Sequence, residues 1–383
     1  MSAIEPFRVE VSDAVLKDLQ ERLARTRLPD EVPDTGWEYG SNLAYMRELL
    51  DYWRTKYDWR KHEAELNRFK HFTATVDGLK VHFIREDGRG PSPKPLLLVH
   101  GWPGSIYEFM EIIPLLTDPS SHGGDARDSF TVIAPSLPGY GFSGHPTARA
   151  MNIQAIADIF HKLMTEVLGY KRYAAQGGDW GSAIVSRMGE VFQPSLFGIH
   201  LNMVAAGPAE GRSAPDLTPE EKVFLGDIEK FRQAETGYQW IQGTKPQTLA
   251  YGLNDSPLGL CAWIVEKFRT WSDCHGNLES SFTKDQLLTN VMIYWITQTA
   301  NSSTRLYYES RHHPWRLKSG TRIETPTAMA MFPGELVRPP RHWAERIYNI
   351  QRWTVMPKGG HFAAMEEPEL LAKDIRAYFR ELN

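Results

Sequence analysis

The chain has 383 residues, of which 42% are hydrophobic, and this proportion allows a large buried core. Its 43 Lys and Arg nearly balance its 47 Asp and Glu, so the formal net charge of -4 argues against a binding surface for nucleic acid or an anionic membrane. No signal peptide and no long apolar run is apparent, so we expect a cytoplasmic protein. Cys261 and Cys274 fit two reduced thiols better than a zinc site.

Residues 1–90 are predicted to form an N-terminal extension that packs on the main domain. Ser12 is typical of a helix N-cap before an apolar run with helical spacing, and a second helix is predicted from Leu43 to Tyr57. Asp77-Gly78 separates two β-rich runs, which predicts a two-residue hairpin at the end of the extension.

Short apolar runs that alternate with helical patterns predict a mostly parallel α/β sheet domain over residues 91–204 and 319–383. The predicted strands are 95–100, 130–134, 173–175, 197–201, 327–331 and 353–356. Residues 205–318 show helical patterns and few strand signals, so we expect a helical cap inserted into the sheet domain. Ligands bind at the carboxyl edge of such sheets, where this insertion is expected.

A glycine-rich turn follows the predicted strand at 173–175 and runs Gly177-Gly178-Asp179-Trp180-Gly181. Strand, tight turn and helix are the setting of the nucleophile elbow G-x-S-x-G, in which glycines permit close backbone contacts. Asp179 stands at the position of the serine, and a carboxylate there can attack carbon directly and form an alkyl ester. An ordinary turn containing Asp has the same residue types, so the elbow alone does not decide the function.

Further positions complete a candidate catalytic set with Asp179. Trp102 follows the first strong strand, where α/β-hydrolases supply one oxyanion N–H, and Trp180 follows the nucleophile and would supply the other. His361 follows the last predicted strand and suits a general base, and Glu335 could orient it. The order along the chain is Asp179, Glu335, His361, that is nucleophile, acid, base, as in α/β-hydrolases. Each of these residues also fits an ordinary loop position.

With these residues in view, the chain resembles the microsomal-type epoxide hydrolases, a family with the α/β-hydrolase fold. The likeness covers nearly the whole chain and is carried by residues 52–54, 58–59, 97–105, 138–143, 177–182, 244–246, 253–257 and 359–364. Many α/β-hydrolases share the glycine motifs, whereas Asp179 at the elbow together with Glu335 after Phe332-Pro333-Gly334 is specific to this group. Membrane-bound members begin with a hydrophobic anchor that this chain does not show, so we expect no membrane attachment.

The resemblance also implies two cap tyrosines whose hydroxyls hydrogen-bond the epoxide oxygen. The match places them at Tyr238 and Tyr307, with the adjacent Tyr308 as an alternative to Tyr307. Ring opening develops an alkoxide, to which phenols can donate a hydrogen bond or a proton. From the residues alone, each tyrosine fits a packing position with a satisfied hydroxyl better than a position in the site.

The expected function is hydrolysis of a small lipophilic epoxide by water to a vicinal diol, through an ester on Asp179 and without a metal or organic cofactor. A haloalkane dehalogenase is an open alternative, because it uses the same nucleophile on the same fold. A non-catalytic binding protein on an α/β-hydrolase scaffold is another, and Asp179 disfavours a serine esterase. The sequence specifies neither the substrate nor the oligomeric state, for which a homodimer is one option.

Overall fold

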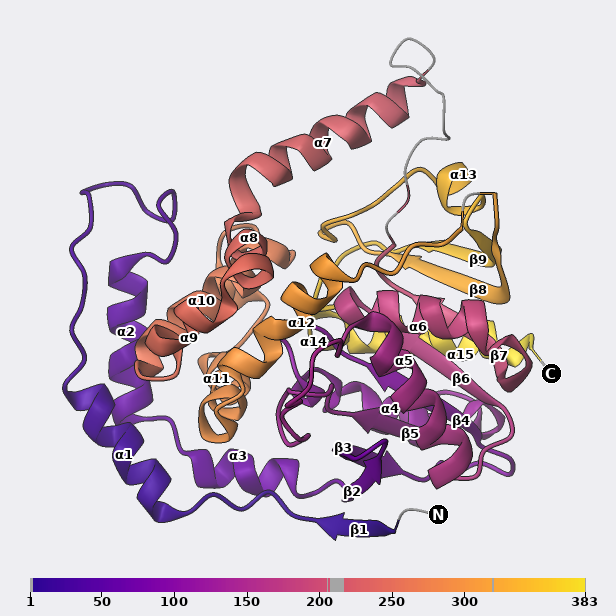
Figure 1. Cartoon of the computed structure of the whole chain (residues 1–383), viewed down its shortest axis with the longest axis horizontal. Helices are drawn as coiled ribbons and strands as arrows, with labels where there is room; N and C mark the ends of the chain where they lie inside the picture. The colour runs from indigo at the N-terminus through magenta and orange to yellow at the C-terminus, as the bar shows by residue number, and fades with distance from the viewer. Residues whose placement is uncertain (1–2, 205, 207–216, 319, 383) are drawn as a thin grey trace.

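Nine strands form one sheet within residues 3–204, 206, 217–318 and 320–382, the part of the chain that the computed structural model describes (Figure 1). Their order is β1-β2-β3-β5-β4-β6-β7-β8-β9. Strands β4 to β9 pair in parallel, whereas β1, β2 and β3 are antiparallel to their neighbours. The strands are β1 Ile4–Phe7, β2 His71–Val76, β3 Leu79–Glu86, β4 Lys94–Val99, β5 Phe130–Pro135, β6 Tyr173–Gly177, β7 Leu196–Leu201, β8 Ile323–Met331 and β9 Tyr348–Val355. The expected mostly parallel α/β sheet is thereby confirmed.

The central strands are apolar on both faces because helices cover both sides of the sheet. Alternate residues of β4 divide between two cores: Leu97 and Val99 join one, and Leu96 and Leu98 join the other. The helices of this domain are α4 Ile112–Thr117, α5 Ile153–Lys162, α6 Asp179–Val191, α13 Arg341–Ala344, α14 Ala363–Glu366 and α15 Pro368–Arg380. Short turns of other helix types are η1 Ile106–Phe109, η2 Pro119–His122, η3 Ala126–Asp128, η4 Leu163–Val167 and η5 Gln193–Ser195. Burial on both faces explains why the strand signals are continuous apolar runs.

The N-terminal extension contributes β1, the β2–β3 hairpin and three helices, α1 Asp13–Ala24, α2 Leu43–Thr55 and α3 Trp59–Leu66. Ser12 caps α1 through its side chain, as predicted. The hairpin turn has positive φ at both central residues, 47° at Asp77 and 79° at Gly78, as expected for this turn sequence. Strand β1 and helix α3 were not predicted from the sequence.

A group of helices lies between β7 and β8 in the sequence and forms a helical cap region. Its members are α7 Pro219–Glu235, α8 Gly237–Thr244, α9 Pro246–Leu253, α10 Pro257–Trp271, η7 Leu278–Ser280, α11 Lys284–Thr297 and α12 Ala300–His312. Figure 1 shows α8 to α12 between the N-terminal helices and the sheet domain, with α7 projecting from the body. Residues 205 and 319, where the predicted cap boundaries fall, lie outside the described residues.

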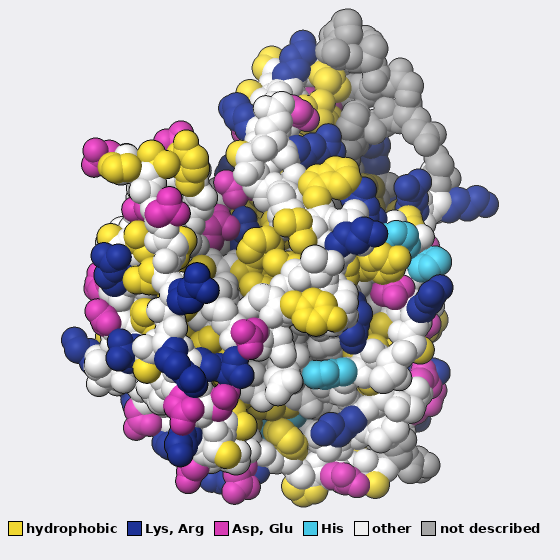
Figure 2. Space-filling model, turned by 60° about the vertical axis from the view of Figure 1, so that its left-hand side comes forward, with side chains coloured by type: hydrophobic (Ala, Val, Ile, Leu, Met, Phe, Trp, Pro, Cys, Tyr) yellow, Lys and Arg dark blue, Asp and Glu magenta, His cyan; other side chains and the backbone are white. Residues whose placement is uncertain are grey.

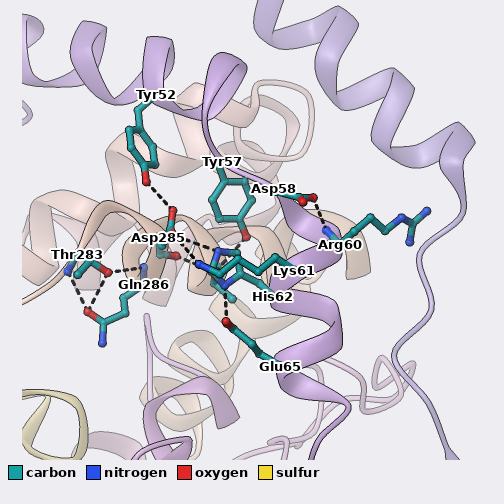
Figure 3. Close-up of polar contacts among 11 residues, drawn as sticks. Tyr52, Tyr57, Asp58, Arg60, Lys61, His62, Glu65, Thr283, Asp285 and Gln286 are labelled. Atoms are coloured by element: carbon teal, nitrogen blue, oxygen red, sulfur yellow. Dashed lines mark hydrogen bonds and ion pairs between the residues drawn. The ribbon is translucent and has the colours of Figure 1, made fainter.

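A polar cluster joins the extension to cap helix α11 (Figure 3). The Asp285 carboxylate accepts a hydrogen bond from the Tyr52 hydroxyl at 2.8 Å and lies 3.3 Å from His62 Nε2 and 3.4 Å from Lys61 Nζ. The other ring nitrogen of His62 lies 2.8 Å from Glu65. Contacts from both α2 and α3 therefore converge on one residue of the cap.

Along the described residues, no helix is both long and apolar enough to cross a bilayer. Figure 2 shows basic and acidic side chains intermixed over one face of the molecule, with hydrophobic side chains between them. Cys261 and Cys274 are free thiols, and both are buried.

Candidate active site

Asp179 occupies a sharp turn between β6 and α6, as the elbow motif predicts. Its φ is 49°, a left-handed conformation that costs a non-glycine residue about 1–3 kcal/mol and that the surrounding structure must hold. Close backbone contacts explain the motif glycines: a Cβ on Gly181 would lie 2.0 Å from the Val99 carbonyl oxygen, and one on Gly177 would lie 2.3 Å from the Gly181 oxygen. The two glycines thus allow the turn to project the Asp179 side chain.

The two oxygens of the Asp179 carboxylate have different partners. Oδ1 accepts a hydrogen bond from the Trp102 backbone N–H at 2.8 Å, and Oδ2 lies 3.4 Å from His361 Nε2. Gly101 permits this approach, since a Cβ there would lie 2.0 Å from Oδ1. The Trp180 amide lies in the first turn of α6, where N–H groups lack an acceptor within the helix. Its role as a second oxyanion donor stays a prediction.

The His361 imidazole pairs with Glu335 on its other side, with Nδ1 and Oε1 2.7 Å apart. Glu335 is 4% exposed, and the same oxygen accepts the Leu336 backbone N–H at 2.7 Å. Burial by itself lowers the pKa of His361, but the negative charges of Glu335 and Asp179 together raise this pKa well above its ordinary value. The protonated imidazole is therefore favoured while Asp179 is a carboxylate.

The loop that carries His361 is tied to the end of cap helix α10. The backbone N–H of His361 donates to the backbone carbonyl oxygen of Trp271 at 2.9 Å. Glu366 accepts from the backbone N–H of Asp273 at 2.8 Å and from that of Phe362 at 3.0 Å, and burial raises the pKa of Glu366 to about 7. No sequence signal links Asp273 with Glu366, so the prediction from sequence missed this support of the His361 loop.

Tyr238 on α8 and Tyr307 on α12 approach each other near Asp179. Their ring centroids lie 5.8 Å apart, and both rings pack against Trp102, at 5.3 Å and 5.7 Å. Burial first of all, and the charge of Asp179 as well, raise the pKa of both hydroxyls, so both remain protonated donors. Tyr308 is 36% exposed and stacks on a neighbouring histidine instead, so the structure brings Tyr307 to the site.

A second buried histidine, His100, lies close to Asp179 but differs from His361 in its partners. Burial lowers its pKa to about 4. Its Nε2 accepts the Leu137 N–H at 3.2 Å, and its Nδ1 lies 2.9 Å from the Gly101 carbonyl oxygen. Both ring nitrogens of the neutral side chain are occupied by the backbone, which indicates a structural role.

The fold and these side chains define an α/β-hydrolase with a carboxylate at the nucleophile position, and no cluster of His, Cys, Asp and Glu suited to a metal ion occurs among the described residues. Residues 4–109 match the family model described as "Epoxide hydrolase N terminus", and residues 94–221 match the alpha/beta hydrolase fold. The chain belongs to the microsomal-type epoxide hydrolase family, and it is an epoxide hydrolase.

Individual relatives support this membership over nearly the full chain. A putative epoxide hydrolase of Stigmatella aurantiaca is 44% identical over 99% of this chain and 85% of its own length. Epoxide hydrolase 1 of Oryctolagus cuniculus is 42% identical over 97% of this chain and 88% of its own. The crystal structure of juvenile hormone epoxide hydrolase from Bombyx mori has a TM-score of 0.89 at 35% identity, covering 100% of this chain and 96% of that one. The membership favours epoxide hydrolysis over a dehalogenase or a non-catalytic scaffold.

Proposed function

We propose that this enzyme converts a small lipophilic epoxide and water to a vicinal diol through a covalent alkyl ester on Asp179. The observation that carries the proposal is the asymmetry of the Asp179 carboxylate. One oxygen is held by the Trp102 amide at 2.8 Å, and the other faces His361 at 3.4 Å. The second oxygen is thereby available for attack, while the first already lies where an ester carbonyl oxygen needs a donor.

In the first step, Asp179 Oδ2 attacks a ring carbon of the epoxide. A carbon–oxygen bond forms to the enzyme, a ring carbon–oxygen bond breaks, and its electron pair stays on the former ring oxygen. Tyr238 and Tyr307 hydrogen-bond that oxygen, and one of them transfers its proton to it. The product is a hydroxyalkyl ester whose carbonyl oxygen is Oδ1, in contact with the Trp102 N–H.

Ester formation changes the protonation preference of His361. The negative charge of Asp179 disappears, so the attraction that raises the pKa of His361 weakens and the imidazolium releases its proton to the phenolate. The neutral imidazole, still oriented by Glu335 at 2.7 Å, can then act as a general base. The same carboxylate thus serves as nucleophile and as a control on when the base becomes available.

In the second step, His361 Nε2 takes a proton from water while the water oxygen bonds to the ester carbon of Asp179. The carbonyl electron pair moves to Oδ1, where the Trp102 N–H stabilises it, and the amide of Trp180 is the proposed second donor. Collapse of this intermediate breaks the bond between ester carbon and alkyl oxygen. His361 protonates the departing diol alkoxide, and the new carboxylic acid returns a proton to His361.

A single turnover in ¹⁸O-labelled water tests the covalent route. We expect the label in the peptide that contains Asp179 and not in the first diol released, because the attacked atom is the ester carbon. Label in the diol instead would indicate direct attack of water on the epoxide and would refute the proposal. Asp179→Ala should abolish turnover, and His361→Gln should accumulate the ester, which intact-protein mass spectrometry detects.

A further inference from the structure

A cavity of about 20 Å³ lies directly against the nucleophile. The polar side chains that line it are His100, Glu108, Gln176, Asp179, Asn202 and His361. A cavity of this size accommodates one water molecule, and a buried water needs two to four polar partners. The cavity therefore has the volume and the chemistry of a site for a single water beside the ester carbon and the base.

Glu108 reaches this cavity from η1, which follows the loop that carries Trp102. Its carboxyl group folds back onto the loop, since a Cβ on Gly104 would lie 1.6 Å from Glu108 Oε1. Gly101 makes room for the Asp179 carboxylate in the same way, at 2.0 Å. Two glycines of one loop thus each admit a carboxyl group, which indicates that the position of Glu108 is built into the site.

The protonation state of Glu108 follows from its surroundings. Burial raises its pKa to about 8, the positive charge of His361 opposes this rise, and the negative charge of Asp179 adds to it. No salt bridge joins Glu108 to a Lys or Arg within the described part of the chain. At neutral pH the protonated carboxyl group can accept a hydrogen bond through its carbonyl oxygen and donate one through its hydroxyl.

We infer that Glu108 positions the water that hydrolyses the ester on Asp179, an inference that rests on the proposed function. A water that attacks must direct one O–H to His361 Nε2 and a lone pair to the ester carbon. Its second O–H then needs an acceptor, and the Glu108 carbonyl oxygen supplies one in the same cavity. Glu108 itself exchanges no proton and touches neither the epoxide nor the ester, so it acts only through the water.

Separate measurement of the two half-reactions tests this role. Rapid-quench single turnovers with styrene oxide give the rates of ester formation and ester hydrolysis for the wild type, Glu108→Leu and Glu108→Gln. The protonated Glu108 is a neutral acceptor, and a neutral hydrogen bond is worth about 0.5–1.5 kcal/mol, so Glu108→Leu should slow hydrolysis about 2- to 13-fold. Its rate of ester formation should stay close to that of the wild type. Glu108→Gln, which accepts and donates like the protonated acid, should retain most of the hydrolysis rate.

Three outcomes overturn the inference. Equal slowing of both half-reactions in Glu108→Leu would indicate a structural role, and no slowing would indicate no role. A loss in Glu108→Gln as large as in Glu108→Leu would show that a negative charge, not a hydrogen bond, is needed.

Glu111→Gln, at an exposed position one turn later, is the matched control. If Glu108→Leu does not fold, Glu108→Ala is measured in the same way, and failure to detect any ester in His361→Gln would refute the proposed function instead.

Discussion

Replacement of Glu335 by Gln isolates the effect of its negative charge on His361, which we propose as the base. Glu335 Oε1 contacts both His361 Nδ1 and the Leu336 N–H at 2.7 Å, whereas Oε2 is buried without a hydrogen-bond partner among the described residues. A glutamine keeps the size of the side chain and can keep the accepting oxygen at the Oε1 position. Its amide group would take the position of the unpartnered oxygen, so the substitution removes the negative charge and breaks no existing hydrogen bond.

The magnitude follows from the kind of hydrogen bond that changes. A hydrogen bond to a charged group contributes about 1.5–3 kcal/mol and a neutral one about 0.5–1.5 kcal/mol, so the expected loss is roughly 1–1.5 kcal/mol. This loss corresponds to a pKa of His361 lower by about one unit and to ester hydrolysis slower by about tenfold, since an imidazolium forms in that step. Ester formation needs no new charge on His361 and should change much less.

Rapid-quench single turnovers across pH measure both effects. The rise of the hydrolysis rate with pH, which reports loss of the His361 proton in the ester, should move to lower pH in Glu335→Gln. Equal slowing of ester formation and hydrolysis, or an unmoved pH profile, would refute the assigned role of Glu335. Glu345→Gln is the control, because this exposed carboxylate pairs with Arg341 at the surface, away from His361.

Tyr307→Phe should slow ester formation about 10- to 100-fold, because it removes a hydrogen-bond donor to the developing alkoxide. Tyr308→Phe, at an exposed position, should leave the rate of ester formation unchanged. Equal slowing by the two variants in stopped-flow measurements would contradict this assignment. Burial alone would raise the pKa of Asp374, but hydrogen bonds from His200 and other partners outweigh this effect. The net result is a pKa lowered from 3.8 to about 2. Because this folded-state pKa is depressed, Asp374 should stabilise the fold by about 2 kcal/mol above pH 4 and lose this contribution as the pH falls towards 2. Urea unfolding of Asp374→Asn should show this loss at pH 7, and an unchanged free energy of unfolding would exclude it. Asp285→Asn should weaken the cluster of Figure 3 and speed hydrogen exchange in α3, and unchanged exchange would argue against this link.

Local sequence patterns were sufficient for the sheet domain and for the elbow. The apolar run ending at Val99 and the glycines around Asp179 act through neighbouring residues, so a strand and a tight turn are readable without the rest of the chain. The positions of Glu335 and His361 after successive strands could also be predicted, because parallel strands end at one edge of a sheet. The structure brings both residues to Asp179, as that argument requires.

Contacts between distant segments were decided only by the tertiary structure. Tyr307 and Tyr308 are adjacent in the sequence, but successive residues of a helix point about 100° apart, so the packing of α12 determines which ring packs against Trp180, next to Asp179. The contact of Glu366 with Asp273 and the cavity lined by Glu108 and His361 likewise join residues that no local pattern relates. Periodicity along the chain specifies which elements form, whereas the distances between their side chains depend on how the elements pack, because packing must satisfy all buried surfaces and polar groups at once.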